Sequence, residues 1–150
     1  MHLFSDLPGF TAPGGGSIPS NVLPTNLRPD IVNVNEASSE VVLFELTCPW
    51  DNNIARSHDF KEGKYAPLVA DLSRRYRTFL FLVEVSVRGQ VTSENKKRLK
   101  AFIYRVTNEP NVVFKSVVTT VSKVALMSSF SIFMARSEPS WSDPPFLNYA

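Results

Sequence analysis

The sequence predicts a single α/β domain in which a mixed β-sheet is flanked by helices, and three observations lead to this fold class. Residues 31–35 and 41–46 are β-branched and apolar around a short polar segment, which is typical of a β-hairpin. Residues 53–75 show the helical spacing of apolar side chains, and residues 78–87 form a further apolar strand. With 150 residues, of which 43% are hydrophobic, the chain can bury one sizeable core.

The predicted hairpin brings two carboxylates together. Its turn falls within residues 36–40, which are small and polar. With the hairpin centred in this turn, Val32 faces Leu43 and Asp30 faces Glu45. Directly opposed residues have Cβ atoms about 4.5–5.5 Å apart, so one cation can contact both carboxylates. However, Ala-Ser is not a favoured two-residue turn, and a shift of one residue would send the two acids to opposite faces of the sheet.

The segment after the hairpin is predicted to be one helix, although Pro67 is expected to kink it or restart it. Lys61 lies in the middle of the apolar stripe that packs on the sheet, and Lys64 lies toward the edge of that stripe. Lysine is rarely buried without a partner, and an acidic metal site would supply one. The stripe consists of Ile54, His58, Lys61, Tyr65, Leu68 and Leu72.

The pairing of Asp30 with Glu45 has a chemical consequence, because opposed carboxylates destabilise a sheet unless something neutralises them. Mg²⁺ is suited to this role, since it binds one or two carboxylates and keeps several waters for a substrate phosphate. Two acids and a lysine at this spacing therefore indicate a hard divalent cation beside a phosphodiester. The alternative is that Asp30 caps a turn and Glu45 is an exposed charge at the end of a strand.

Three segments carry a resemblance to a known family: Arg28-Pro29-Asp30, Glu45-Leu46-Thr47, and residues 57–65 with the sequence SHDFKEGKY. They resemble the restriction-like endonuclease domain of site-specific non-LTR retrotransposons, a branch of the PD-(D/E)xK nuclease superfamily. That branch has Lys/Arg-Pro-Asp, a spacer of the length found here, Asp or Glu, and then a Lys-x-x-Lys-Tyr helix. The resemblance covers roughly residues 6–106 and implies a restriction-endonuclease-like mixed β-sheet core flanked by helices within residues 28–135.

The resemblance implies a divalent-metal-dependent DNA endonuclease, derived from a retrotransposon, that nicks DNA by phosphodiester hydrolysis. Asp30 and Glu45 would hold Mg²⁺ or Mn²⁺, and the main-chain carbonyl of Leu46 is a further ligand. The implied partners are DNA and a reverse transcriptase encoded by the parent element.

The catalytic lysine is the point at which the chain departs from the wider superfamily. There a lysine follows the second acid by two residues, where this chain has Thr47. The retrotransposon branch takes its lysine from the next helix, which implies Lys61 or Lys64 as the catalytic residue. The apolar stripe favours Lys61, whereas Lys64 begins the Lys-Tyr dipeptide shared with the family.

Basic residues are unevenly distributed, although the formal net charge is only +2. From the resemblance, Arg28 and Tyr65 are expected to bind nucleic acid. A second basic cluster surrounds the apolar stripe of a helix that begins near residues 92–95, so its side chains are expected to face solvent. These side chains either contact phosphates, with strongly salt-dependent binding, or form only a solvated helix face. The cluster is Lys96, Lys97, Arg98 and Lys100.

Two further groups of titratable residues are expected to be structural. Glu84, near the end of the last predicted strand, is expected to pair with Arg88 rather than to join the metal site. His58 and Asp59 could serve as metal ligands, but a histidine on a helix surface is more often structural.

The two ends of the chain are predicted to lie outside the compact domain. Residues 1–27 are rich in proline and glycine, which indicates an extended arm, and residues 136–150 are expected to form an irregular tail. Cys48 is the only cysteine, so no intramolecular disulfide can form. A reducing intracellular location, nuclear or cytoplasmic, is therefore expected.

Residues 112–134 are apolar enough to raise the question of a membrane span. Lys115, Lys123 and numerous serines and threonines argue against a span, and no membrane partner is expected. The stretch is instead predicted to form one or two helices that cover the sheet.

Two other function classes stay open at this stage. The first is a catalytically inactive, nuclease-like module that binds nucleic acid or another partner. The second is a small soluble enzyme unrelated to nucleases, although the sequence lacks the GxSxG, P-loop and dinucleotide-binding motifs.

Overall fold

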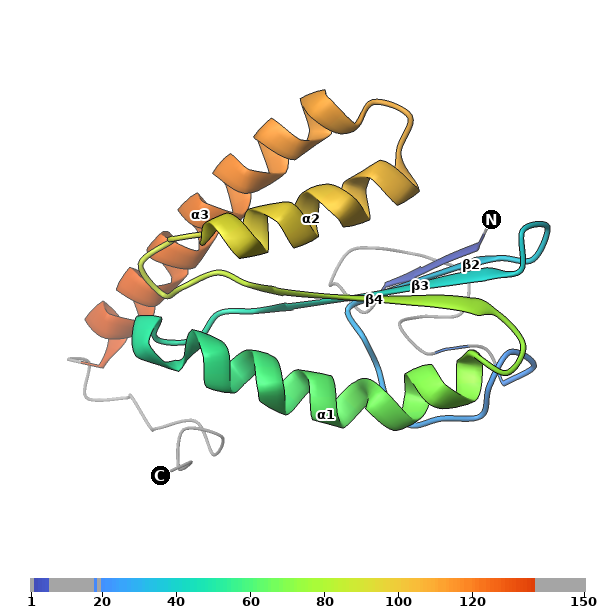
Figure 1. The fold of residues 1–150 in the computed structure, drawn as a ribbon. Helices are drawn as coiled ribbons and strands as arrows, with labels where there is room; N and C mark the ends of the chain where they lie inside the picture. Colours follow the sequence, from blue (N-terminus) through green and yellow to red (C-terminus); the bar gives the residue numbers. More distant parts are fainter. Residues whose placement is uncertain (1, 6–17, 19, 137–150) are drawn as a thin grey trace.

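The computed structural model describes residues 2–5, 18 and 20–136, and Figure 1 shows their arrangement. The elements in chain order are β1 (His2–Ser5), β2 (Ile31–Asn35), β3 (Glu40–Thr47), the short 3-10 helix η1 (Asp51–Asn53), α1 (Ile54–Leu72), β4 (Arg77–Glu84), α2 (Ser93–Val106) and α3 (Pro110–Ala135). The strands form one sheet in the order β1-β2-β3-β4, in which β4 is parallel to β3 and the other pairs are antiparallel. The prediction of an α/β fold with a mixed sheet flanked by helices is confirmed.

The sheet is the middle layer of the molecule, with helices on both faces (Figure 1). Helix α1 connects β3 to the parallel strand β4 and covers one face, because a connection between parallel strands must cross over the sheet. Helix α2 covers the other face, and α3 packs beside it. Helix α1 therefore covers one face of the sheet only.

The hairpin of β2 and β3 has the predicted register, with Val32 opposite Leu43. Its turn is longer than two residues and spans residues 36–39. Ser39 has a φ angle of 52°, in the left-handed region, and its N–H donates to the Glu36 carbonyl at 3.2 Å. The unfavourable Ala-Ser pair therefore does not have to form a tight two-residue turn.

The core on the α1 face is built from every second residue of the central strands, since alternate side chains of a strand face opposite sides. Full burial of one such aliphatic side chain stabilises the fold by about 1.5–3 kcal/mol. The buried members of this core are Ile18, Val22, Val32, Val34, Val41, Leu43, Tyr65, Leu68, Leu72 and Leu82.

The opposite face of the sheet is covered by α2 and has no charged residue in its buried core. Phe44 of β3 stacks on Phe102 of α2 with 4.3 Å between ring centroids. Such stacked pairs contribute about 0.5–1.5 kcal/mol beyond their burial. The buried members are Val42, Phe44, Val83, Val85, Leu99, Phe102 and Ile103.

The helices α1 and α2 agree with the predictions. Pro67 lies inside α1, which nevertheless continues as one helix to Leu72. Thr92 caps α2, because its hydroxyl oxygen accepts a hydrogen bond from the Asn95 N–H at 3.2 Å. Strand β4 ends at Glu84, three residues earlier than predicted.

The predicted extended arm requires a correction. Residues His2–Ser5 form the edge strand β1 and pair with β2, and Ile18 and Val22 are buried in the core of the α1 face. Part of the first 27 residues therefore belongs to the domain, because its apolar side chains complete a core that α1 alone does not fill. Residues 6–17 and the predicted tail after Arg136 lie outside the described residues.

Helix α3 is a single helix of 26 residues, and its cover of the fold is partial. Its first half packs against the core beneath α2 through half-buried residues such as Val113, Val117 and Val121. Its second half exposes large apolar side chains. By length and composition alone the helix could cross a membrane, a test that the core helices of soluble proteins also pass. The exposed side chains are Val124, Leu126, Met127, Phe130, Ile132, Phe133 and Met134.

Candidate functional site

Asp30 and Glu45 lie side by side where the hairpin of β2 and β3 ends. The register of the hairpin, continued by one residue, places Asp30 opposite Glu45. The Leu46 N–H donates to Asp30 Oδ2 at 2.7 Å, and the Asp30 N–H donates to Glu45 Oε2 at 3.3 Å. These reciprocal bonds hold both carboxylates at the rim of the sheet. The predicted pairing is therefore confirmed as a spatial arrangement.

Lys61 of α1 contacts the buried carboxylate directly. Its ammonium group forms an ion pair with Glu45 Oε1, and both side chains are largely buried, at 20% and 7% exposure. The helix places Lys61 here because residues 54, 58, 61 and 65 fall on the stripe that faces the sheet. Glu45 is thus the acidic partner that the buried Lys61 requires.

Tyr65 lies one helical turn beyond Lys61 and is fully buried. Its hydroxyl donates to Glu45 Oε2 at 2.9 Å, and the Arg28 carbonyl at 3.3 Å is a second possible acceptor. Burial raises the pKa of the Tyr65 hydroxyl, and the negative charges of Glu45 and Asp30 raise it further. Tyr65 therefore stays a neutral hydrogen-bond donor. The expectation that it binds nucleic acid is wrong, because no part of its side chain reaches the surface.

Lys64 takes a different place from Lys61. Its side chain is exposed, and its Nζ atom lies 3.4 Å from the Tyr65 hydroxyl and 4.9 Å from the centre of the Tyr65 ring. Lys64 therefore borders the site through Tyr65, whereas Lys61 touches a carboxylate.

The carbonyl of Leu46 is directed toward the same site by the hairpin. The N–H and C=O of one strand residue point to the same side, and the Leu46 N–H bonds to Asp30, so the Leu46 carbonyl faces the β2 side of β3. The residue that continues the register opposite Leu46 is Pro29, which has no N–H to donate to that carbonyl. The strand geometry therefore directs a third oxygen toward the β2 side of the rim, where Asp30 lies.

The oxygen atoms at this site suit a hard divalent cation. Carboxylate and carbonyl oxygens are the ligands that Mg²⁺ and Mn²⁺ prefer, and Mg²⁺ needs only one or two carboxylates from the protein. Within residues 2–5, 18 and 20–136, no group of three or more His, Cys, Asp or Glu side chains forms a metal-binding cluster. A cation bound here would therefore have Asp30 and Glu45 as its carboxylate ligands, and water would complete its coordination.

A second buried carboxylate, Glu84, was assigned the wrong partner from the sequence. Glu84 is 1% exposed, and its Oε1 lies 3.0 Å from Nδ1 of His58. Its Oε2 lies 3.6 Å from Nη1 of Arg98. Arg88 instead pairs with Asp51. The signal that could have revealed this cluster was a glutamate inside an otherwise apolar strand, which needs a buried partner.

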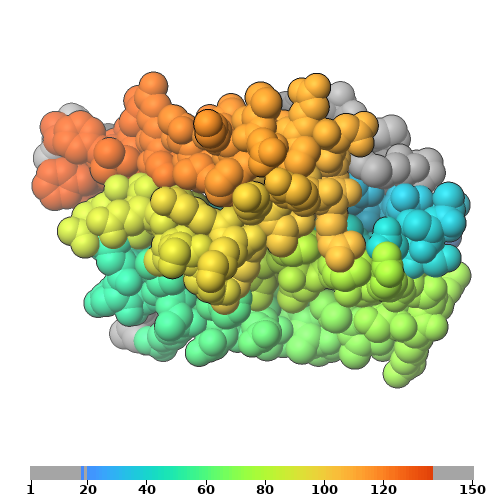
Figure 2. All heavy atoms as spheres, turned by 45° about the horizontal axis from the view of Figure 1, so that its top comes forward, coloured from blue at the N-terminus to red at the C-terminus, as the bar shows by residue number. Residues whose placement is uncertain are grey.

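The four basic residues of the α2 cluster differ in their contacts. Arg98 forms ion pairs with Glu84 at 3.6 Å and with Glu94 at 3.8 Å, so its charge is partly compensated within the protein. Lys96, Lys97 and Lys100 are exposed, as predicted, on the helix that lies across the sheet from α1. The space-filling view shows α3, α2 and α1 on the same face of the molecule, with α2 next to α3 (Figure 2).

Comparison with known proteins does not assign the chain to a family. No protein-family model matches the sequence, and no curated protein matches it. The site is therefore interpreted from its own geometry.

Proposed function

We propose that this chain is a divalent-metal-dependent DNA endonuclease with a restriction-endonuclease-like fold. The observation that carries the proposal is the convergence of Asp30, Glu45 and Lys61 at the rim of the sheet. The order of the elements also supports it, since an antiparallel hairpin is followed by a crossover helix and a parallel strand. A retrotransposon origin and a reverse transcriptase partner follow from the resemblance of the motifs alone.

In this function Asp30, Glu45 and the Leu46 carbonyl hold Mg²⁺ or Mn²⁺. A metal ion held by these residues would lower the pKa of a water molecule and offset the negative charge that develops on the phosphate oxygens. Tyr65 fixes the orientation of Glu45 through its hydrogen bond, and its raised pKa keeps it protonated as a donor. The hairpin fixes Asp30 through the Leu46 N–H.

Lys61 supplies the positive charge that the wider superfamily takes from a residue on the strand. Thr47 occupies that strand position, and its hydroxyl lies 3.3 Å from the hydroxyl of Ser57 on α1. The ammonium group of Lys61 already reaches Glu45 from the same helix. Next to a bound phosphodiester it would orient the attacking water or stabilise the charge of the transition state.

The test is a plasmid-nicking assay with Mg²⁺, with Mn²⁺ and with EDTA. We expect Asp30→Asn and Lys61→Met each to reduce the rate of metal-dependent nicking by about a hundredfold or more, because each removes a group at the reacting centre. Glu36→Gln, in the exposed turn of the same hairpin, is the matched control and should keep full activity. Nicking that survives Asp30→Asn would assign the activity to another site.

A non-catalytic, nucleic-acid-binding module is the second candidate, and one observation favours it. Glu45 is already bonded to Lys61, Tyr65 and the Asp30 N–H, so the site is satisfied by the protein itself. Calorimetric titration with Mn²⁺ separates the two candidates. The endonuclease binds Mn²⁺ through Asp30, whereas the module binds DNA equally well in EDTA and shows no heat of metal binding.

A further inference from the structure

The outer edge of β4 is open in the part of the chain that the structure describes, because β4 pairs with β3 alone. The Arg77 N–H donates to the Ser39 carbonyl in the turn before β3, and the Val85 N–H donates to the Thr47 carbonyl of β3. Since successive residues of a strand direct their main-chain groups to opposite sides, the even-numbered residues Thr78, Leu80 and Leu82 direct theirs away from β3.

One end of this edge is already closed by a side chain. The N–H of Glu84, the next even-numbered residue, donates to Oδ1 of Asn95 at 3.2 Å, and Asn95 is buried. This bond confirms the direction of the outward groups. The outward N–H of Glu84 is thus hydrogen-bonded to a neighbouring side chain. The outward N–H and C=O groups of Leu80 and Leu82 can bond in the same way to a further strand.

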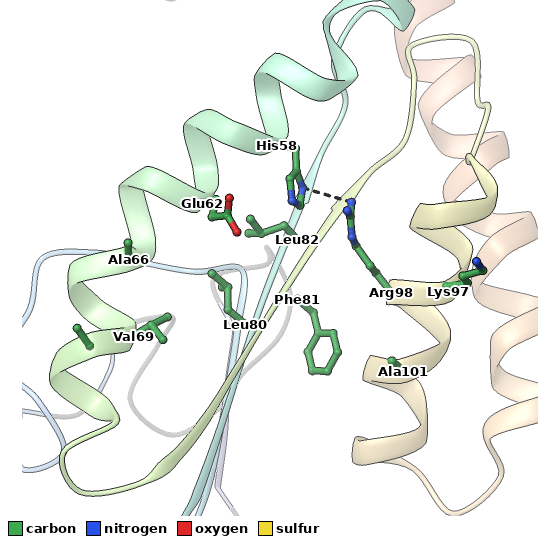
Figure 3. Close-up of a pocket in the computed structure, with 11 residues that line it drawn as sticks. His58, Glu62, Ala66, Val69, Leu80, Phe81, Leu82, Lys97, Arg98 and Ala101 are labelled. Carbon is green, nitrogen blue, oxygen red and sulfur yellow. Dashed lines mark hydrogen bonds between the residues drawn. The ribbon is translucent and has the colours of Figure 1, made fainter.

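A groove of about 810 Å³ follows this edge between α1 and α2 (Figure 3). Leu80 and Leu82 form part of the floor of the groove. Its walls include the small side chains of Ala66 on α1 and Ala101 on α2, which leave space between the two helices. An added strand lies about 4.7–4.9 Å from its neighbour in a sheet. The groove therefore offers a position for one extended segment in line with the existing strands.

The two walls of the groove differ in charge. The α2 wall carries Lys97 and Arg98; Arg98 is partly exposed and pairs with Glu84 at 3.6 Å, so Lys97 is the more exposed of the two charges. The α1 wall is mostly apolar apart from Glu62 and a histidine. Side chains of an added strand alternate between the two walls. A strand with an acidic side chain toward α2 and apolar side chains toward α1 would match both.

We propose that this groove binds an extended segment of a protein partner, which adds a strand beside β4. The partner strand forms main-chain hydrogen bonds with Leu80 and Leu82, and its carboxylate pairs with Lys97. A second copy of the chain fits less well, because its own β4 is set back between its own α1 and α2. Two such recessed edges cannot approach to the spacing of paired strands. The proposal does not depend on the endonuclease function.

The test uses a phage-displayed library of short random peptides, selected against the whole chain. Ala66 is exposed, so Ala66→Trp fills the groove without entering a core. Ala55→Trp, also exposed on α1 but outside the groove, is the matched control. We expect selected peptides with alternating acidic and apolar residues, whose affinity falls at least about tenfold with Ala66→Trp and is unchanged with Ala55→Trp.

Charge and main-chain pairing are tested with the best selected peptide. Lys97→Glu is expected to weaken binding about fivefold, and a peptide with lysine in place of its acid restores it. Lys96→Glu, outside the groove, has no such effect. Hydrogen exchange of the Leu80 and Leu82 amides slows in the complex.

Three results would overturn the proposal. The first is a library that yields no peptide whose binding depends on Ala66. The second is a complex in which the Leu80 and Leu82 amides exchange as fast as in the free protein. The third is self-association in sedimentation experiments that Ala66→Trp abolishes, which would assign the edge to a second copy.

Discussion

Glu45 and Glu84 are two buried carboxylates on the same face of the sheet, and they differ in the groups that surround them. They lie on neighbouring parallel strands, where Glu45 is in register with Leu82 and Thr47 with Glu84. Both face α1, and both are less than one tenth exposed. The sequence patterns around them are similarly apolar, so burial alone does not distinguish the two acids.

Their neighbours do distinguish them. Glu84 faces a guanidinium group and an imidazole, supplied by Arg98 and His58, and its N–H is bound by Asn95. The single buried acid Glu84 is thus paired with a cationic side chain, Arg98, as is usual for buried charges. Glu45 instead lies beside a second acid, Asp30, at the rim of the sheet. Two adjacent carboxylates favour a divalent cation, which a single lysine does not replace.

The largest expected difference between the two acids is in catalysis. In the proposed endonuclease, Glu45→Gln is expected to reduce metal-dependent nicking about 10³-fold, because it would remove one of the proposed metal ligands. Glu84→Gln keeps the shape of the side chain and is expected to reduce nicking by no more than about tenfold. Initial rates of plasmid nicking measure both. Equal losses would mean that Glu84 also belongs to the reacting centre.

For stability, in contrast, replacing Glu84 is expected to have a larger effect than replacing Glu45. Glu84→Ala leaves the half-buried Arg98 without its buried partner and is expected to lower the free energy of unfolding by about 2 kcal/mol. Glu45→Ala is expected to lower it by only about 1 kcal/mol, because the loss of the Lys61 and Tyr65 contacts is largely offset by the removal of the repulsion between Glu45 and Asp30. Urea unfolding of both variants at neutral pH measures the difference. A larger loss for Glu45→Ala would contradict the assignment of Glu84 as the structural acid.

The smallest expected effect concerns Tyr65 at high pH. Because the folded-state pKa of Tyr65 is raised, the folded chain keeps a proton that the unfolded chain loses above about pH 10. Its contribution is complete below that pH and is lost as the pH rises through the folded-state pKa. Tyr65→Phe should lower the free energy of unfolding by about 1 kcal/mol at neutral pH and flatten this alkaline decline. Urea unfolding across the alkaline range measures it.

Tyr104→Phe is the control for this measurement, because Tyr104 is exposed and its hydroxyl bonds to the side chain of Asn111 away from the site. Its alkaline decline should equal that of the wild type. An unchanged decline in Tyr65→Phe would show that other groups cause it.

Much of the site could be predicted because its parts are close in sequence. The alternation of apolar residues in β2 and β3 defines one register that buries Val32 and Leu43 together, and the same register pairs Asp30 with Glu45. The helical stripe of α1 then places Lys61 above the sheet. Local patterns of this kind do not depend on how the rest of the chain folds.

The contacts of Glu84 could not be predicted in the same way. They join α1, β4 and α2, and the angle between the two helices decides which side chains meet. The placement of β1 was missed for a similar reason. Four residues beside a glycine-rich segment carry little pattern, and their pairing with β2 is a long-range contact.

The candidate site is formed entirely by the contiguous segment from Arg28 to Tyr65. Asp30 and Glu45 are 15 residues apart, and Glu45 and Lys61 are 16 apart. A hairpin and the helix after it form such contacts without closing long loops, which favours their early formation during folding. A protein engineer could therefore transplant the candidate site into another scaffold as one piece, provided that the new scaffold covers the apolar faces of the hairpin and the helix.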